Sequence, residues 1–402
     1  MQHFVVIGAG QAGSSLVAKL RSEGFSDKIT LIGGEPVPPY QRPPLSKAYL
    51  LGEMAQDRLY LRPAAFYADQ DIDLRLDTRA VQIHPDVRAV TLEDGEVLNY
   101  DALALTTGAH PRTLPSAIGG DLDNVFTVRD LADADAMAPA FRDGAKALII
   151  GGGYIGLEAA AVAAKRGVHV TVVEMADRIL QRVAAPETSD FFRALHERHG
   201  VVVREGVGLD RLSGSDAVSG AILSDGTELD IDFAIVGVGI APATILAEAA
   251  GLDIELGIKT DAYSRSSDPH IWAAGDCASC LFDGQRTRIE SVGNAIDQAE
   301  NAARNMMGQN VAYAPAPWFW SDQYDCKLQI AGLNIGYTDV HVRMGDGGQS
   351  HWYYKNDQLI AVDAMNDPRN YMVGKRLIEA GKSPAPAVIA DPSTDMKALL
   401  RA

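Results

Sequence analysis

The spacing of hydrophobic residues near the start of the chain predicts a strand, a helix and a second strand. The apolar run 4–7 has the length of a buried parallel strand, the segment 16–20 has the period of a helix, and the apolar run 29–32 predicts the next strand. Three glycines at the G-x-G-x-x-G spacing follow the first run, and an acid follows the second: Gly8, Gly10, Gly13 and Glu35. Such glycines permit a tight turn, a close approach of the backbone to a pyrophosphate, and close packing of helix against strand. Because a helix N-terminus offers N–H groups to phosphate, the segment predicts a dinucleotide-binding turn.

The same pattern occurs again from residue 147. Apolar runs at 147–150 and 168–173 predict two parallel strands, and the alanine-rich segment 157–164 between them predicts a helix. Three glycines and a terminal acid again occupy the motif positions: Gly151, Gly153, Gly156 and Glu174. The two copies indicate two dinucleotides. The carboxylate of Glu174 favours NAD over NADP because it would bind a ribose hydroxyl and repel a 2′-phosphate, and Arg178 offers the alternative of accommodating that phosphate.

The rest of the hydrophobic pattern adds hairpins and a third domain. Asp-Gly pairs at 94–95 and 225–226 predict hairpin turns. From about residue 313, tryptophans cluster and short alternating segments predict an antiparallel sheet in a separate C-terminal domain. Three further apolar runs lead into turns that contain glycine: 100–105, 233–236 and 271–274. In a parallel sheet such turns lie at the carboxyl edge, where ligands bind.

Composition and charge narrow the classes of partner. The 402 residues are enough for two or three domains, and 47% of them are hydrophobic, as in ordinary globular proteins. A net charge of −17 argues against nucleic acid or an anionic membrane as a general partner. The sequence shows no signal peptide and no apolar run of membrane-spanning length, so we expect a cytoplasmic protein. Three cysteines fit a reducing compartment.

A proline-rich loop follows the first dinucleotide motif. Prolines on both sides of Tyr40 argue against a regular helix before Leu45, and Ser46 is a suitable N-cap for a short helix that starts after it. Arg42 and Lys47 in this loop are placed to meet a phosphate or a cofactor ring, or are ordinary solvated charges.

Several longer stretches together resemble the FAD-containing, NADH-dependent ferredoxin reductases of the putidaredoxin reductase type. This group belongs to the pyridine nucleotide-disulfide oxidoreductase superfamily, and the resemblance extends over essentially the whole chain. Besides the two glycine motifs, the matching stretches are PPYQRPPLSK (38–47), TTGAHPR (106–112), AAGDCA (273–278), ESVGNAIDQA (290–299), PWFWSDQY (317–324) and VDAMNDPRNYMVGKRLI (362–378).

The resemblance implies an α/β fold with two Rossmann-like, glutathione reductase-like dinucleotide-binding domains and a C-terminal α+β domain. The FAD-binding domain would comprise residues 1–109 and 237–312, the NAD-binding domain residues 110–236, and the C-terminal domain residues 313–402.

The resemblance also implies two cofactor sites and a catalytic set. The residues expected at FAD are Gly8, Gly10, Ala12, Gly13, Glu35, Arg42, Lys47, Val81, Thr107, Gly108, Arg112, Asp276 and Val292. Those expected at NAD are Gly151, Gly153, Tyr154, Ile155, Gly156, Glu174 and Gly239. Lys47 and Glu158 resemble a lysine–glutamate pair near flavin N5, and Trp320 would lie near the isoalloxazine ring. A cation held by a carboxylate at that position stabilises negative charge on reduced flavin. No metal site is expected.

The activity implied is hydride transfer from NADH to FAD, followed by single-electron transfer to a 2Fe-2S ferredoxin. That ferredoxin would feed a cytochrome P-450-type monooxygenase or a ring-hydroxylating dioxygenase. Because such ferredoxins are acidic and this chain carries −17, docking requires a local basic patch. Candidates by position are Arg304, Arg369, Lys375 and Arg376, which are otherwise plain surface charges.

Other functions stay open at this point. Cys277 and Cys280 form a C-x-x-C, the pattern of a redox dithiol, but they follow Gly275-Asp276 directly and so lie outside the places where disulfide reductases of this superfamily keep theirs. We expect a helix to begin there over the cofactor, with both thiols as packing residues. The alternatives are a rubredoxin reductase, an NADH oxidase or peroxidase, and a non-catalytic flavoprotein of the apoptosis-inducing-factor type.

Overall fold

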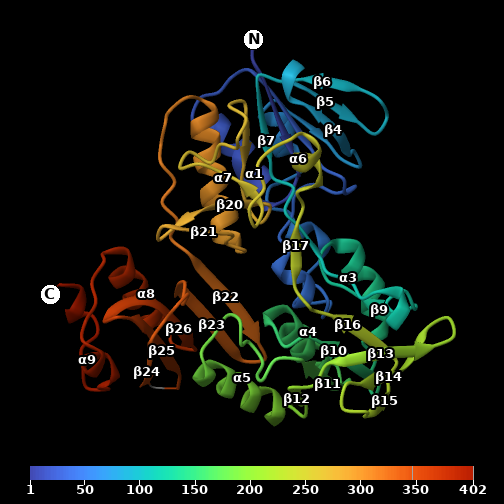
Figure 1. Ribbon diagram of the computed structural model, residues 1–402, viewed down its shortest axis with the longest axis vertical. Coiled ribbons are helices and arrows are strands. Elements are labelled where there is room, and N and C mark those ends of the chain that lie inside the picture. The colour runs from blue at the N-terminus through green and yellow to red at the C-terminus, as the bar shows by residue number, and fades with distance from the viewer. Residues whose placement is uncertain (346, 402) are drawn as a thin grey trace. The chain divides into compact units, whose positions relative to one another are not determined.

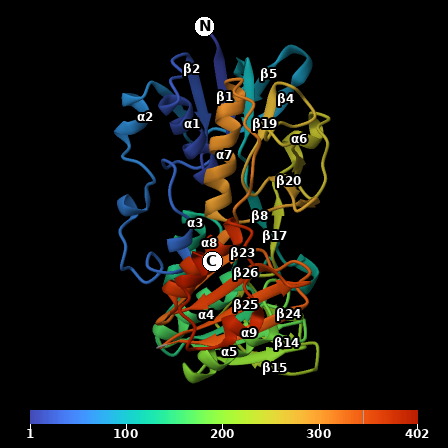
Figure 2. The same ribbon diagram turned by 90° about the vertical axis from the view of Figure 1, so that its left-hand side faces the viewer.

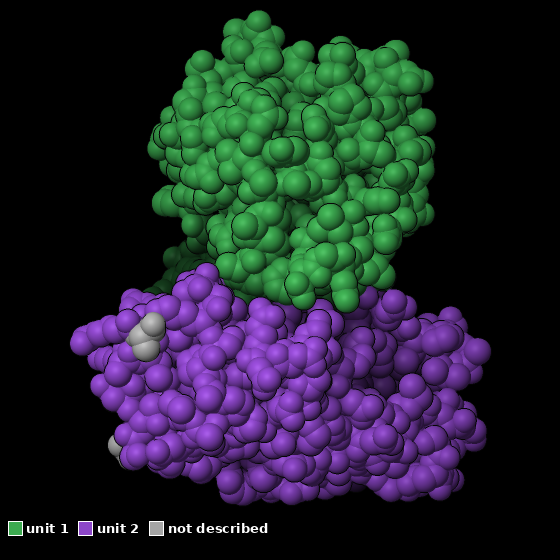
Figure 3. All heavy atoms as spheres, turned by 60° about the vertical axis from the view of Figure 1, so that its left-hand side comes forward, with its two compact units in different colours: residues 1–41, 56–110, 241–317 green, residues 42–55, 111–240, 318–402 purple. Residues whose placement is uncertain are grey.

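The computed structural model describes residues 1–345 and 347–401, and its contacts divide the chain into two compact units (Figure 3). Unit 1 comprises residues 1–41, 56–110 and 241–317, and unit 2 comprises residues 42–55, 111–240 and 318–402. Each unit therefore contains one of the two glycine motifs, and unit 2 also contains the C-terminal segment. The three-domain division expected from the sequence stays a prediction.

Unit 1 is built on a parallel five-stranded sheet with the strand order β19-β7-β1-β2-β3. Its strands are β1 (His3–Ile7), β2 (Lys28–Ile32), β3 (Ile72–Arg75), β7 (Ala102–Leu105) and β19 (Ile271–Ala273). Strand β1 pairs with β2 from His3↔Lys28 to Ile7↔Ile32, and with β7 on its other side. Helix α1 (Gln11–Ser22) packs along α7 (Val292–Met306), although the two lie far apart in the sequence (Figures 1 and 2).

Smaller elements complete unit 1. Two three-stranded sheets have the orders β4-β5-β6 and β18-β20-β21. Their strands are β4 (Ala80–His84), β5 (Ala89–Leu92), β6 (Val97–Asn99), β18 (Ile258–Lys259), β20 (Ala278–Phe282) and β21 (Gln285–Thr287). The short helices are α2 (Ala65–Asp69), α6 (Ile245–Ala249), η2 (Gln56–Leu59) and η3 (Pro85–Val87). Strands β8 (Ala109–Pro111) and β17 (Ile240–Pro242), which each contain residues of both units, form a two-stranded sheet.

Unit 2 contains a second parallel sheet with the order β12-β11-β10-β16-β9. Its strands are β9 (Val125–Phe126), β10 (Lys146–Ile150), β11 (His169–Glu174), β12 (Val202–Glu205) and β16 (Phe233–Val236). The helices of this part are α3 (Leu131–Met137), α4 (Tyr154–Lys165), α5 (Pro186–Arg198), η1 (Pro43–Ser46), η4 (Ser116–Ile118) and η5 (Ala138–Ala140). A three-stranded antiparallel sheet is formed by β13 (Leu209–Gly214), β14 (Val218–Leu223) and β15 (Glu228–Asp230).

The C-terminal part of unit 2 is an antiparallel sheet with the order β22-β23-β26-β25-β24. Its strands are β22 (Trp318–Gln323), β23 (Cys326–Gly332), β24 (Asp339–Met344), β25 (Gln349–Lys355) and β26 (Gln358–Met365). The helices are α8 (Pro368–Glu379), α9 (Pro386–Ala390) and η6 (Ala398–Leu400).

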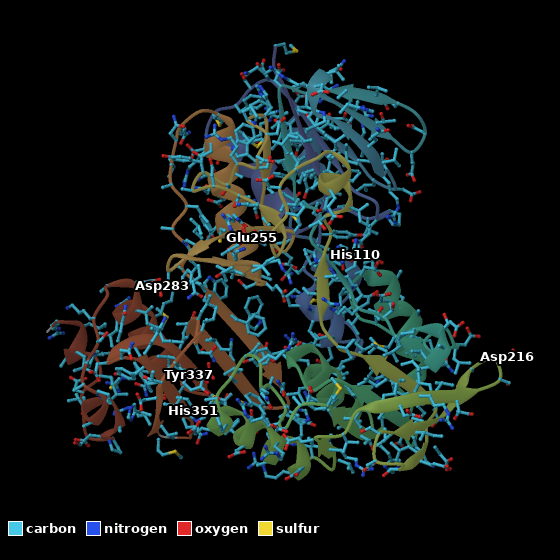
Figure 4. The ribbon with its side chains drawn as sticks, viewed as in Figure 1. His110, Asp216, Glu255, Asp283, Tyr337 and His351 are labelled. Carbon is cyan, nitrogen blue, oxygen red and sulfur yellow. The ribbon has the colours of Figure 1, made fainter. Side chains whose placement is uncertain are left out.

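This C-terminal sheet and the second parallel sheet share one interior. Cys326, Leu328 and Met365 belong to the same buried cluster as side chains of β10 and α4. Thr188 of α5 hydrogen-bonds His351 of β25, labelled in Figure 4, at 2.7 Å, and donates to Asp363 of β26 at 2.8 Å. Burial raises the pKa of Asp363 to about 6. The C-terminal sheet is thus joined to the second parallel sheet by apolar packing and by buried hydrogen bonds.

The mixed α/β fold, both strand–helix–strand repeats, both Asp-Gly hairpins and the C-terminal antiparallel sheet are confirmed. Two local predictions were wrong. Ser46 ends a 3₁₀ helix instead of capping one, because prolines are accepted in a first helical turn and the Ser46 hydroxyl bonds elsewhere. The residues after Asp276 form β20 and not a helix, because 258–259 and 285–287 pair with them.

No helix among the described residues is long and apolar enough to cross a membrane.

Candidate active site

The first glycine turn lies at the carboxyl end of β1 in unit 1. Gly8 has φ +113°, and a Cβ there would lie 2.2 Å from the carbonyl oxygen of Thr106. A Cβ on Gly13 would lie 2.0 Å from the carbonyl oxygen of Gly8. A Cβ on Gly10, in contrast, would meet no atom within 4 Å. Gly8 and Gly13 are therefore required by packing, whereas Gly10 borders open space at the start of α1, where helix N–H groups can bind an anion.

Three further segments of unit 1 carry residues expected at FAD: those that follow β19 and β7, and the start of α7. Gly275, after β19, approaches both α1 and α7, since its Cβ would lie 3.2 Å from that of Ala12 and 3.7 Å from that of Ala295. Asp276 is the next residue, and Val292 begins α7. Thr107 and Gly108 follow β7, and the Thr107 hydroxyl donates to the carbonyl oxygen of Ala243 at 2.7 Å.

The remaining expected residues of unit 1 lie on other loops. Glu35, after β2, accepts a short hydrogen bond from the hydroxyl of Tyr40. Val81 lies at an irregularity in β4 and is 53% exposed. Arg79, which no motif indicates, extends beside the glycines after β2, since a Cβ on Gly34 would lie 3.3 Å from its Cγ.

Gln298 of α7 was also missed. Its Oε1 accepts hydrogen bonds from the N–H of Gly275 at 3.0 Å and from Nδ2 of Asn294 at 3.4 Å. These bonds fix the orientation of the amide, and its Nε2 is buried without a partner among the described residues. A buried donor of this kind indicates a missing ligand. The G-x-G-x-x-G motif does not predict this residue, because Gln298 belongs to a helix that starts almost 280 residues later.

Lys47 and Glu158 form an ion pair inside unit 2. The Nζ of Lys47 lies 2.9 Å from Oε1 of Glu158, and the two side chains are only 16% and 6% exposed. The hydroxyl of Ser321 donates to Oε1 at 2.7 Å, and that of Ser46 donates to Oε2 at 3.1 Å. Burial raises the pKa of Glu158, whereas Lys47 and the two hydroxyls oppose this rise. Neither serine was predicted to contact Glu158.

The second glycine turn repeats the geometry of the first. Gly151 has φ +107°, and its Cβ would lie 2.4 Å from the carbonyl oxygen of Gly237, while a Cβ on Gly156 would lie 2.3 Å from that of Gly151. A Cβ on Gly153 would again meet nothing within 4 Å. Tyr154 and Ile155 form the first turn of α4.

Glu174 ends β11 next to this second turn. Its Oε2 accepts from the N–H of Gly152 and its Oε1 from the N–H of Ala176, both at 2.8 Å. The guanidinium of Arg178 donates instead to the hydroxyl of Ser189 at 2.6 Å. On the opposite side of the sheet edge, Gly239 has φ +103°, and its carbonyl oxygen accepts from the N–H of Arg112 at 2.9 Å.

Arg42 and Trp320 also lie in unit 2. Arg42 donates to the carbonyl oxygen of Arg129 at 2.7 Å. Trp320 of β22 stacks on Trp318 with ring centroids 5.4 Å apart. The two tryptophans line a surface hollow together with Phe319, Lys327, Gln329 and Tyr371.

The four basic residues suggested for partner docking are divided between the two units. Arg304 belongs to unit 1 and pairs with Glu23 at 3.1 Å. The other three lie on α8, where Lys375 stands over the ring of Trp318 at 5.7 Å. Arg369 lies 3.6 Å from Asp395.

The cysteines are free thiols. Cys277, Cys280 and Cys326 are all buried, and burial raises the pKa of each thiol. Groups of acids, histidines and cysteines that could hold a metal are absent from residues 1–345 and 347–401.

Known proteins resemble the chain along its whole length. Residues 2–299 match the family model described as pyridine nucleotide-disulphide oxidoreductase, and residues 318–400 match the model described as reductase C-terminal. Putidaredoxin reductase of Pseudomonas putida is 40% identical over 99% of this chain and 96% of its own length. The ferredoxin–NAD(+) reductase component of the anthranilate 1,2-dioxygenase system of Burkholderia cepacia is 38% identical over 99% of both chains. Among solved structures, the reductase in a covalent putidaredoxin reductase–putidaredoxin complex superposes with a TM-score of 0.96 at 38% identity, covering 100% of this chain and 98% of its own.

Proposed function

This chain belongs to the pyridine nucleotide-disulphide oxidoreductase family, and from that premise we propose that it is an FAD-containing, NADH-dependent ferredoxin reductase. Its acceptor is a 2Fe-2S ferredoxin that serves a cytochrome P-450-type monooxygenase or a ring-hydroxylating dioxygenase. The observation that carries the proposal is the presence of two separate dinucleotide turns in a chain whose C-terminal segment matches that of reductases. Three free cysteines support a reducing compartment, and we place the protein in the cytoplasm.

The first turn fits the nucleotide part of FAD. The open space at Gly10 and the unpartnered Nε2 of Gln298 are what a bound group would fill and satisfy. On this proposal the turn at 8–13 holds the pyrophosphate, Glu35 the ribose, and Asp276 the ribitol. When bound, FAD accepts a hydride and gives up single electrons, which is the chemistry that joins a two-electron donor to a one-electron acceptor. We propose that the other residues expected at FAD from the sequence also contact this cofactor.

The second turn fits a nicotinamide dinucleotide. Gly153 borders open space as Gly10 does, and Glu174 is held in place by two backbone N–H groups. A carboxylate fixed in this way accepts ribose hydroxyls and repels a 2′-phosphate. Because Arg178 is bound to Ser189, the arginine that could rescue NADPH is already engaged.

The protein's own contribution to catalysis is electrostatic and positional. Lys47 supplies a cation that Glu158 holds at 2.9 Å in a buried setting, where a fixed charge acts more strongly than in water. We assign this pair to the reactive edge of the flavin and Trp320 to its ring. We also propose the domain boundaries expected from the sequence: 1–109 with 237–312 for FAD, 110–236 for NAD, and 313–402 for the C-terminal domain. The basic face of α8 beside Trp318 is the proposed docking site for an acidic ferredoxin.

The function is tested by mixing the purified yellow protein with NADH and a 2Fe-2S ferredoxin coupled to cytochrome c. We expect ferredoxin-dependent reduction of cytochrome c, with little consumption of oxygen or peroxide. Rubredoxin in place of the ferredoxin tests the nearest alternative. Fast oxygen or peroxide turnover with a poor response to ferredoxin would overturn the proposal.

Replacing Glu174 with serine is expected to change the choice of nucleotide. The variant loses the carboxylate that would bind the ribose and repel a 2′-phosphate, so KM for NADH should rise about tenfold, and NADPH should be used at a comparable rate. The measurement is kcat/KM with each nucleotide. Glu174→Gln keeps the size and the acceptor oxygen but removes the charge, so it separates repulsion from hydrogen bonding. A native enzyme that prefers NADPH would contradict the assignment.

A further inference from the structure

A continuous chain of side-chain hydrogen bonds leads from the Glu158 carboxylate to the partly exposed ring of Tyr324. Ser321 Oγ lies 2.7 Å from Oε1 of Glu158, and Nε2 of Gln323 lies 3.1 Å from Ser321 Oγ. Oε1 of Gln323 lies 2.8 Å from Nε2 of His196, and the hydroxyl of Tyr324 lies 3.1 Å from Nδ1 of the same ring. All five residues belong to unit 2.

Hydrogen-bond chemistry allows only one direction for this chain when Glu158 is ionised. A carboxylate only accepts, so Ser321 donates its proton to Glu158 and its oxygen accepts from the amide nitrogen of Gln323. The amide oxygen of Gln323 therefore faces His196, which donates from Nε2–H. The unprotonated Nδ1 of His196 then accepts from the hydroxyl of Tyr324. Every donor points towards Glu158.

The three middle members of this hydrogen-bond chain are enclosed and uncharged. Ser321, Gln323 and His196 are each 0% exposed. Burial lowers the pKa of His196 to about 4, so the ring is neutral at pH 7, and the proximity of His199 also lowers this pKa. Lys47 is the charged group that faces Glu158, beside the hydroxyls of Ser46 and Ser321. His199 stacks on Tyr324 with ring centroids 3.7 Å apart, and its Nδ1 bonds the backbone oxygen of Leu195, so His199 does not belong to the chain.

We propose that Tyr324, His196, Gln323 and Ser321 form a directed hydrogen-bond relay. The relay holds the hydroxyl of Ser321 as a donor to the ionised Glu158 and so keeps this carboxylate paired with Lys47. These four are positioning residues, since they act through Glu158. Each bond of the relay polarises the next, so Ser321 binds the ionised carboxylate more strongly than an isolated hydroxyl would, and a proton on Glu158 is disfavoured beyond the effect of a single hydroxyl. The significance for electron transfer rests on the proposed function, whereas the relay itself does not.

The relay is tested by the protonation of Glu158 in the purified protein, without NADH or ferredoxin. The probe is the infrared band of a protonated carboxylic acid, assigned by its loss in Glu158→Gln and followed against pH. In Gln323→Leu and His196→Leu we expect the proton affinity of Glu158 to rise about tenfold, so that the band appears about one pH unit higher than in the unmodified protein. His196→Gln should restore the normal titration, because its Nε2 can still donate to Gln323.

His199→Phe is the matched control and should leave the titration unchanged, because it keeps the aromatic stack outside the relay. Equal shifts in the His199 and His196 variants would overturn the proposal. A second measurement needs no variant: ¹⁵N spectra of labelled histidine should show His196 as the Nε2–H tautomer at pH 7, and a Nδ1–H tautomer would overturn the relay. If the protein does not reduce ferredoxin but Glu158 titrates as expected in all variants, the proposed function is contradicted and the relay is still supported.

Discussion

Replacing Lys47 with methionine is expected to reduce NADH-dependent ferredoxin reduction about 100-fold, the usual scale for losing one preorganised charge at a reacting centre. Methionine keeps the length of the side chain and removes the cation that lies 2.9 Å from Glu158. Glu158 is then left buried with hydroxyl donors only. The rate is measured with saturating ferredoxin, and Lys47→Arg is the control that keeps the charge.

The same substitution should destabilise the protein by about 3 kcal/mol at pH 8, because it leaves one partner of a buried ion pair without the other. The cost should be smaller at pH 5. Burial raises the pKa of Glu158 and Lys47 opposes that rise, so without Lys47 the folded-state pKa moves further above its unfolded value. The folded protein then binds a proton more readily than the unfolded chain, and stability is lost as pH rises through that window.

Urea unfolding at the two pH values measures this difference. The double variant Lys47→Met/Glu158→Gln removes both charges and should recover part of the stability at pH 8. Equal destabilisation at both pH values, with no recovery in the double variant, would show that the pair is not the source of the effect.

Gly13→Ala and Gly10→Ala should separate folding from cofactor binding. The new methyl at residue 13 would lie 2.0 Å from a backbone oxygen, which cannot move away cheaply, so we expect a loss of about 3 kcal/mol or more and little folded protein. The methyl at residue 10 meets no protein atom within 4 Å, and Gly10 has an ordinary extended backbone with φ −95°. That variant should fold with unchanged thermal stability as apoprotein, yet bind FAD at least about tenfold more weakly (about 1.4 kcal/mol).

Thermal unfolding of the apoprotein and titration with FAD provide both measurements. Gly153→Ala in the second turn is the matched control, since it also borders open space but should weaken NADH binding and leave FAD content unchanged. If Gly10→Ala retains full FAD affinity, the first turn is not where the pyrophosphate binds.

Local features of this fold could be predicted because each depends on neighbouring residues. The strands at 3–7 and 146–150 contain the short apolar runs 4–7 and 147–150, and each is followed by a glycine motif that a nucleotide turn requires. The alternating pattern of 351–354 indicated an antiparallel sheet but could not give the strand order, in which β23 pairs with β26. Strand order depends on packing between distant segments, which periodicity does not encode.

The candidate site was predictable in its motif residues and not in the residues that support them. Lys47, Glu158 and both serines bonded to Glu158 lie in stretches that resemble a known family, but the resemblance assigns a role only to Lys47 and Glu158. Ser46 and Ser321 are ordinary hydroxyl residues 112 and 163 positions from Glu158, and nothing in their local sequence indicates the contact. Gln298 likewise becomes informative only when its Nε2 is found buried and unpartnered.

The position of β22 limits how this protein can be modified by exchanging segments. One face of the strand carries the tryptophans beside α8, and its Ser321 also completes the surroundings of Glu158. Thr188 ties β25 and β26 of the same sheet to α5. A chimaera that takes residues 318–402 from a relative would therefore change both the outer surface beside α8 and the surroundings of the buried Lys47–Glu158 pair. Retargeting the reductase to another redox protein by such grafting requires the donor's counterparts of Ser46, Glu158 and Thr188 to be transferred together with the segment.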